Sequence, residues 1–264
     1  MTPESGPDIG AAAIEAAIRS PKAGGPALVA YLTAGFPTRD AFAGLVQEVA
    51  GVADVVEIGI PFSDPMADGA TIQDASRVAL EQGASLGWAL DALADAFPSG
   101  PPAPLVLMSY LNPLLRFGME RLAERSVAAC VSGVIVPDLP YDETDEVAGP
   151  LRERGMGVVQ MATVVSSAER LRLVGEATSG FLYAVTSLGT TGSGSLDTSG
   201  VTRFLDDLRA ITQAPVCAGF GIRTPDHVRS LAGHCDGVIV GSALVETIGS
   251  GGSAGAFLRS LRIG

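Results

Sequence analysis

The sequence predicts an α/β fold of a single domain, residues 1–264, in which eight parallel strands close into a barrel surrounded by helices. Three observations support this prediction. The length of 264 residues is normal for such a barrel. Short apolar or β-branched runs alternate strictly with helical patterns, which is typical of a parallel sheet. No linker long enough to separate two domains interrupts the middle of the chain.

Eight strands are expected where apolar or β-branched residues form short uninterrupted runs. In chain order, these runs cover residues 27–33, 55–58, 105–108, 134–136, 158–161, 181–185, 216–219 and 238–240. Eight such units in a chain of this length favour a closed barrel over an open sheet.

Helical patterns lie between the strands, at residues 40–50, 72–82, 86–96, 119–129, 143–154, 168–177, 201–211, 225–231 and 243–248. Gly83 is expected just after the end of one helix and Ser85 at the N-cap of the next. An extra helix at residues 10–19 precedes the first strand, where it is placed to plug the barrel, and a last helix covers 254–261. The expected architecture is a (β/α)8, or TIM, barrel with an extra N-terminal helix.

The composition indicates a globular protein without nucleic-acid or membrane partners. Lys and Arg number 17 against 29 Asp and Glu, and the net charge of −12 has the wrong sign for binding nucleic-acid phosphates or anionic lipids. No apolar run is long enough to cross a bilayer, and the N-terminus lacks the features of a signal peptide. Three cysteines in apolar surroundings suit buried free thiols in a reducing compartment, so a cytoplasmic location is expected.

Rare residue types exclude several chemistries. Lys22 is the only lysine and precedes the first strand, which disfavours Schiff-base chemistry, pyridoxal phosphate held by this chain, and a phosphate loop with a lysine. His227 and His234 are the only histidines and show no zinc-ligand spacing. Residues 83–87 match the G-x-S-x-G pattern, but a helical run precedes them where a serine hydrolase needs a strand. Catalysis must then rely on carboxylates, hydroxyls and backbone amides.

Two carboxylates stand out near the end of the second strand, on the barrel face where active sites of this fold are built. Glu57 lies within the apolar strand itself, which is costly unless the carboxyl is paired or used. Asp68 lies in the loop beyond. Each has a structural alternative: Glu57 as a hydrogen-bonded core or edge residue, and Asp68 as the N-cap of the following helix.

The last three strand ends are rich in glycine, at residues 188–192, 219–222 and 241–243. Glycine lets backbone amides approach a ligand closely, and a helix N-terminus favours an anion. The loops after strands seven and eight are also the usual phosphate position of this fold. The sequence therefore predicts a phosphate cradle made mostly of backbone.

Seven segments together resemble the tryptophan synthase alpha chain family along essentially the whole chain. The most specific segment is VEIGIPFSDPMADG, residues 56–69. The other six occur in family order: TAGFP at 33–37, LMSYLNP at 107–113, VPDLP at 136–140, GTTG at 189–192, AGFGI at 218–222 and VGSALV at 240–245.

The resemblance implies a lyase that cleaves indole-3-glycerol phosphate to indole and glyceraldehyde 3-phosphate in tryptophan biosynthesis. Glu57 would be the general acid/base, Asp68 would face the indole N–H, and Tyr183 would line the active site. The indole pocket would be shaped by Tyr31, Leu107, Ile135 and Phe220, and the phosphate would be held by Gly192, Gly221, Gly241 and Ser242. Thr191 would belong to a mobile lid that closes near Asp68.

The resemblance also implies a partner, the beta chain, in an alpha2beta2 heterotetramer. Asp64, Asn112 and Pro140 lie where the family docks that subunit. Pyridoxal phosphate would be bound by the beta chain, and no cofactor by this chain. The sequence departs from the family pattern at residues 162–166 and 193–195, which puts lid closure and its coupling to the partner in question.

The chemistry agrees with the residues available. Retro-aldol cleavage requires a proton at indole C3 and a stabilised N1–H, which two carboxylates can supply without an amine or a metal. One alternative is another phosphate-binding barrel, such as a sugar-phosphate isomerase or epimerase, but it should carry a His or Lys at a strand end. The others are a stand-alone indole-3-glycerol-phosphate lyase and a noncatalytic phosphate-binding regulatory barrel.

Overall fold

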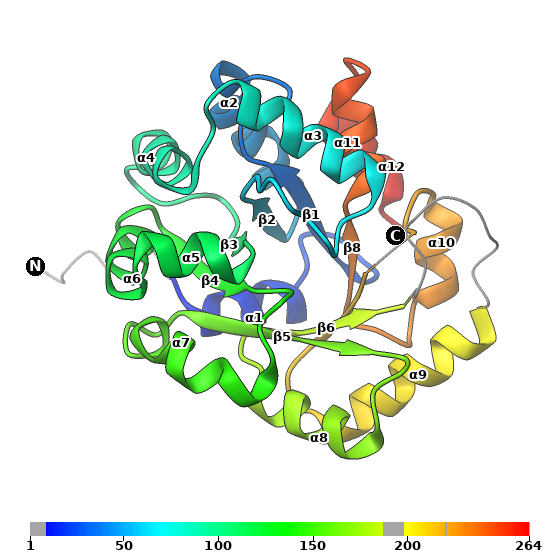
Figure 1. The fold of residues 1–264 in the computed structure, drawn as a ribbon. Helices are drawn as coiled ribbons and strands as arrows, with labels where there is room; N and C mark the ends of the chain where they lie inside the picture. Colours follow the sequence, from blue (N-terminus) through cyan, green and yellow to red (C-terminus); the bar gives the residue numbers. More distant parts are fainter. Residues whose placement is uncertain (1–8, 187–197, 220, 264) are drawn as a thin grey trace, which may run out of the picture.

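A computed structural model describes residues 9–186, 198–219 and 221–263 of the chain. In this part of the chain, eight strands form one closed barrel, and each strand is parallel to both neighbours, β1 and β8 included. In order, β1 to β8 are Ala27–Thr33, Val55–Gly59, Leu105–Met108, Val131–Ile135, Gly157–Thr163, Leu182–Val185, Val216–Gly219 and Gly237–Val240. The predicted TIM barrel is confirmed (Figure 1).

Helices surround the barrel as an outer layer (Figure 1). In order, α1 to α12 are Ala11–Arg19, Arg39–Ala50, Ala70–Glu81, Leu86–Ala96, Leu111–Phe117, Met119–Ala128, Thr144–Arg152, Ala168–Ala177, Thr198–Ile211, Pro225–Leu231, Ser242–Gly249 and Ala254–Leu261. A short 3-10 helix, Tyr141–Glu143, precedes α7. The expected caps are present, because Gly83 has a φ of 78° and the Ser85 side chain accepts a hydrogen bond from the Trp88 amide. Among the described residues, no helix has the length and apolar character of a membrane span.

The bounds of several elements differ from the expected ranges by up to three residues, and one helix was not expected. Strand β4 was expected to begin at residue 134 because Gly133 interrupts the apolar pattern, but the strand begins at Val131. A Cβ at Gly133 would lie 2.8 Å from Ile14 Cδ1, so the glycine makes room for α1. Helix α5 was not expected, since it is short and contains Pro113; the proline is tolerated because it lies in the first turn.

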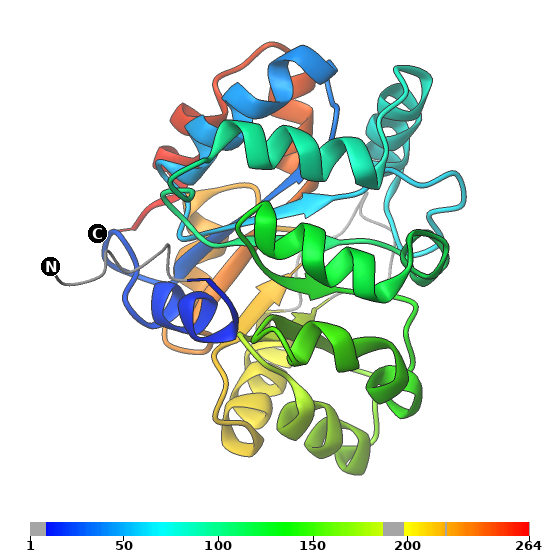
Figure 2. The same ribbon diagram turned by 90° about the vertical axis from the view of Figure 1, so that its left-hand side faces the viewer.

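The apolar core has two layers that follow from the alternation of side chains along each strand. Inward-facing residues such as Val55, Val106 and Phe181 fill the barrel, and outward-facing residues pack against the helices. Ile14 and Ile18 of α1 join the interior layer. Figure 2 shows α1, in blue, across one end of the barrel. With that end plugged, the interior opens at the carboxyl ends of the strands.

Candidate active site

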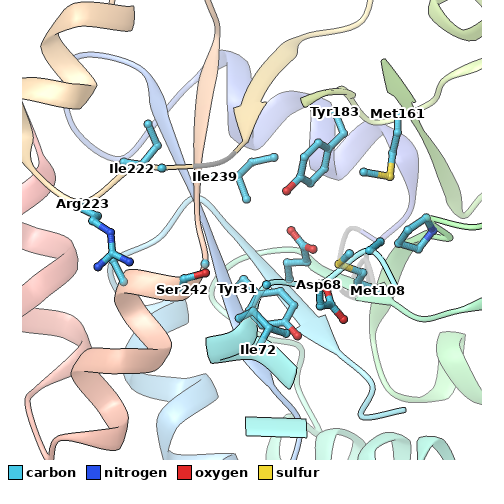
Figure 3. A pocket seen from close by; sticks show the side chains of 17 residues that line it. Tyr31, Asp68, Ile72, Met108, Met161, Tyr183, Ile222, Arg223, Ile239 and Ser242 are labelled. Carbon is cyan, nitrogen blue, oxygen red and sulfur yellow. The ribbon is translucent and has the colours of Figure 1, made fainter. Parts of the chain in front are cut away.

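A cavity of about 780 Å³, which includes its open mouth, lies at the carboxyl ends of the strands. Loops after β2, β7 and β8 form much of its wall (Figure 3). The cavity is lined by Tyr31, Glu57, Ala67, Asp68, Gly69, Ile72, Met108, Pro137, Met161, Tyr183, Gly221, Ile222, Arg223, Ile239, Gly241, Ser242 and Ala243. Both candidate carboxylates are therefore in the same largely apolar space.

Glu57 is fully buried on the inner face of β2. Neither of its carboxyl oxygens has a hydrogen-bond partner within the described residues, which argues against a structural core glutamate. Burial raises the pKa of Glu57 to about 8, and the nearby Asp68 charge adds to the rise. Glu57 is therefore protonated near neutral pH and can act as an acid.

Asp68 is held differently, by a hydrogen bond from the neighbouring strand-end loop. The Tyr110 hydroxyl donates to Asp68 Oδ2 at 3.1 Å and accepts from the Ala67 amide at 2.9 Å. Gly69, not Asp68, is the N-cap of α3, and it has no side-chain cap, so the structural alternative for Asp68 fails. Burial raises the pKa of Asp68 to about 6, and the Tyr110 hydrogen bond opposes that rise.

The two carboxylates thus differ in charge near neutral pH. Glu57, with its pKa of about 8, holds a proton, while Asp68, with its pKa of about 6, is mostly ionised. Titratable groups whose environments separate their pKa values are typical of acid–base sites. The cavity presents a proton donor and an anionic hydrogen-bond acceptor to the same ligand.

We expect Tyr110→Phe to shift the acidic limb of the kcat/KM profile to higher pH. The hydroxyl favours the ionised form of Asp68, so its loss raises the pKa of that carboxyl above its present value of about 6. The alkaline limb, set by Glu57, should move less. Indole release, the activity that the resemblance implies, is followed from pH 5 to 9 to measure both limbs, and an unchanged acidic limb would contradict the role of this hydrogen bond.

Five of the expected site residues line the cavity beside the carboxylates: Tyr31, Tyr183, Gly221, Gly241 and Ser242. Ile135 lies in the barrel interior but is not part of the cavity wall. Thr191, Gly192 and Phe220 lie outside the described residues, as do residues 193–195.

Leu107 is not in the cavity, which corrects the expectation taken from the resemblance. Its side chain faces outward and packs in the layer between the barrel and the helices. Met108, the next residue of β3, lines the cavity instead. The strand alternation places Val106 and Met108 inward, so the register of β3 excludes Leu107.

Two glycines make room for the two tyrosine rings. A Cβ at Gly59 would lie 2.0 Å from the Tyr31 hydroxyl oxygen, and one at Gly219 would lie 2.4 Å from Tyr183 Cε1. Real Cβ atoms essentially never lie so close to another atom, so a Cβ at either position would force the tyrosine ring or the strand to move. The glycines at the ends of β2 and β7 therefore serve ring packing, a role that the sequence alone did not indicate.

The described residues of the expected phosphate cradle, Gly221, Gly241 and Ser242, line the cavity beyond the ends of β7 and β8. Gly221 has a φ of 83°, a conformation that favours glycine, and Gly241 is the N-cap of α11, which begins at Ser242. Figure 3 shows Arg223 beside Ser242 and away from Asp68. Gly221 and the N-terminus of α11 thus both line the cavity.

The expected docking residues are exposed in the segments that follow three strands, at the same end of the barrel. Asp64 follows β2, Asn112 lies in α5 after β3, and Pro140 follows β4. Met66, in the segment after β2, and Leu115, in α5, are 83% and 53% exposed.

The unusual segment 162–166 includes the end of β5 and a turn in which the Ser166 amide donates to the Thr163 carbonyl at 3.0 Å.

Within the described residues, no group of three or more His, Cys, Asp and Glu side chains is arranged to hold a metal ion. All three cysteines are buried free thiols. The chemical groups that the cavity itself presents are the two carboxyls, the hydroxyls of Tyr31, Tyr183 and Ser242, and Arg223.

Comparison with known proteins identifies the family of the chain. The sequence model of the family described as tryptophan synthase alpha chain matches residues 18–257. The chain belongs to the tryptophan synthase alpha chain family. Both carboxylates and the cradle residues at 221, 241 and 242 lie within the matched region.

Individual relatives give the same result. The tryptophan synthase alpha chain of Bacillus cereus (strain AH820) is 45% identical over 196 residues, which cover 74% of this chain and 76% of the relative. That of Oceanobacillus iheyensis is 40% identical over 232 residues, covering 87% and 88%. A Pyrococcus furiosus structure, from work on mutual activation of the tryptophan synthase a2b2 complex, has a TM-score of 0.82 at 34% identity and covers 89% of this chain and 97% of its own.

Proposed function

We propose that Glu57 and Asp68 carry out the alpha reaction of tryptophan synthase in this chain. The reaction is the lyase cleavage of indole-3-glycerol phosphate to indole and glyceraldehyde 3-phosphate, a step of tryptophan biosynthesis. The observation that carries the assignment is the pair of carboxyls in one cavity, Glu57 fully buried and Asp68 partly buried, with pKa values of about 8 and about 6. Near neutral pH, the neutral Glu57 can act as an acid and the anionic Asp68 can act as a hydrogen-bond acceptor toward the same ring.

Glu57 alone can carry out both proton transfers of the reaction. Its carboxyl donates a proton to indole C3, which leaves the ring cationic and Glu57 ionised. The carboxylate then takes the proton from the hydroxyl on the glycerol carbon bonded to C3, and the C–C bond breaks. The electrons of the broken C–C bond return to the ring, which leaves as neutral indole, and the former hydroxyl becomes the carbonyl of the aldehyde. Glu57 ends protonated, as it began.

Asp68 contributes charge. Its carboxylate accepts the hydrogen bond from N1–H, and that bond strengthens while the ring is cationic, so the interaction favours the transition state over the substrate. Tyr110 keeps Asp68 in place and favours its ionised form. Met108, Met161 and Ile239 supply apolar surface for the indole ring.

Phosphate recognition falls to backbone groups at Gly221, Gly241 and Ser242. The substrate-binding roles expected for Thr191, Gly192 and Phe220 stay predictions, because these residues lie outside the described part of the chain. The proposal needs no bound cofactor in this chain, since the carboxylates supply both proton transfer and charge stabilisation.

We expect Gly221→Val to raise KM about tenfold or more with a smaller change in kcat, because a β-branched residue is strained at a φ of 83° and displaces the amides from the phosphate. Gly233→Val is the matched control. Gly233 has a φ of 87°, no atom would lie within 4 Å of its added Cβ, and it does not line the cavity. A structure with glycerol phosphate bound away from Gly221 would contradict the assignment.

The partner in this proposal is the tryptophan synthase beta chain, in an alpha2beta2 complex. The exposed rim around Asp64, Asn112 and Pro140 surrounds the cavity mouth, so a subunit docked there can receive indole directly. Pyridoxal phosphate would be held by the beta chain. In this chain the only lysine, Lys22, lies before β1, and its Nζ donates to the Ala50 carbonyl, away from the cavity.

Indole release by the purified chain, measured with and without beta chain from the same source, tests the function. We expect the cleavage rate to rise and the sedimentation coefficient to increase when the subunits are mixed at micromolar concentration. Fast cleavage that does not respond to the beta chain would favour a stand-alone lyase. No cleavage under either condition, with phosphate ligands still bound, would favour a noncatalytic barrel.

A further inference from the structure

Arg223 and Glu246 form an ion pair at the edge of the proposed phosphate site. Arg223 Nη1 donates to Glu246 Oε2 at 2.6 Å, and Nη2 donates to Oε1 at 3.0 Å. Thr71 Oγ1, on α3, donates to the same Oε1 at 3.0 Å. The pair therefore joins the loop after β7 to α11 and α3, three segments whose residues line the cavity.

Arg223 is the single cationic side chain among the described residues that line the cavity, and both of its Nη atoms are used by Glu246. Glu246 lies one turn beyond Ser242 on α11, the helix whose N-terminus faces the proposed phosphate. An unbalanced carboxylate at this position would repel a phosphate dianion across the cavity edge. The pairing leaves the local charge at zero.

We propose that Arg223 is a charge-balancing partner of Glu246, which protects phosphate binding from the Glu246 carboxylate without itself binding the phosphate. This inference rests on the phosphate site of the proposed function. Because both side chains are about half exposed, the ion pair contributes little to the stability of the fold. Its main effect on a nearby anion is electrostatic. Affinity for phosphate esters should then follow the summed charge at positions 223 and 246.

Binding of glycerol 3-phosphate at low salt, measured by calorimetry, tests the inference with four proteins. The wild type and Arg223→Ala/Glu246→Gln have a summed charge of zero, Glu246→Gln has one positive charge, and Arg223→Ala has one negative charge. We expect the dissociation constant to rise about tenfold in Arg223→Ala, to return to within about threefold of the wild type in the double variant, and to fall in Glu246→Gln. The rise in Arg223→Ala should shrink as salt is added.

Other roles for Arg223 predict a different order of the dissociation constants among the four proteins. If Arg223 bound the phosphate directly, the double variant would stay as weak as Arg223→Ala. If the pair served only to hold the loop, Glu246→Gln would weaken binding as much as Arg223→Ala. Either result would overturn the inference. In the lyase assay, Arg223→Ala should raise KM and leave kcat unchanged.

Arg229→Ala is the matched control, because Arg229 pairs with Asp226 on α10 and does not line the cavity. It should bind glycerol 3-phosphate as the wild type does. A wild type that bound no glycerol 3-phosphate would overturn the phosphate site itself, and this inference with it. Tight wild-type binding with the wrong order among the variants would overturn the charge-balancing role alone.

Discussion

Glu57→Gln is expected to abolish indole release, with a loss in kcat of about 10²- to 10⁴-fold or more. Glutamine has nearly the same shape but cannot pass a proton to C3 or take one from the hydroxyl. Binding of glycerol 3-phosphate should stay within about twofold, because the cradle is formed by other segments. Stopped assays of indole measure the effect. A variant that kept more than about a tenth of the wild-type rate would contradict the role of Glu57.

The same substitution should stabilise the fold at alkaline pH. The pKa of Glu57 is about 8 in the folded chain against an ordinary value of 4.5. As the pH rises between these values, the unfolded chain ionises this group while the folded chain does not, so the folded state loses stability relative to the unfolded state. Glu57→Gln removes that loss. Its gain in Tm over the wild type should be larger near pH 8.5 than near pH 4.5.

Asp68→Asn has the second largest expected effect, a loss in kcat of about 10²- to 10³-fold. The amide can still accept from Tyr110 and so can preserve the loop, but it carries no charge to stabilise the cationic ring. Asp74→Asn is the matched control, because Asp74 is an exposed carboxylate on α3 that does not line the cavity. A rise in KM alone, with kcat unchanged, would show that Asp68 only binds the substrate.

Much of the barrel follows from short-range patterns in the sequence. Runs such as 27–33 and 105–108 coincide with β1 and β3, because continuous apolar residues mark strands buried on both faces. Helix α5 could not be found in this way, since its seven residues include a proline and fall below the usual length of a helical pattern. The helix forms because Leu114 is buried in the core and the helix packs against α4 and α6, contacts that a short sequence pattern does not indicate.

The site was predictable where a residue type was out of place. Glu57 stood out as a charge in an apolar strand, and the structure finds it buried in the cavity. Tyr110 could not be identified, because its contact with Asp68 joins residues that are 42 positions apart. The pairing of Arg223 with Glu246 likewise depends on tertiary structure. The expectation that Leu107 lines the cavity was wrong because successive residues of a strand point to opposite faces. An error of one residue along the strand therefore exchanges an outward side chain for an inward one.

The central claim is that Glu57 is a neutral acid at the pH at which Asp68 is an anion. Infrared difference spectra of the wild type against Glu57→Gln, recorded across pH, measure this directly, because a protonated carboxyl and a carboxylate absorb at separate frequencies. We expect a protonated-carboxyl band from Glu57 at neutral pH that disappears with a midpoint near the pKa of about 8. A carboxylate band at neutral pH, with a midpoint near the ordinary value of 4.5, would contradict it.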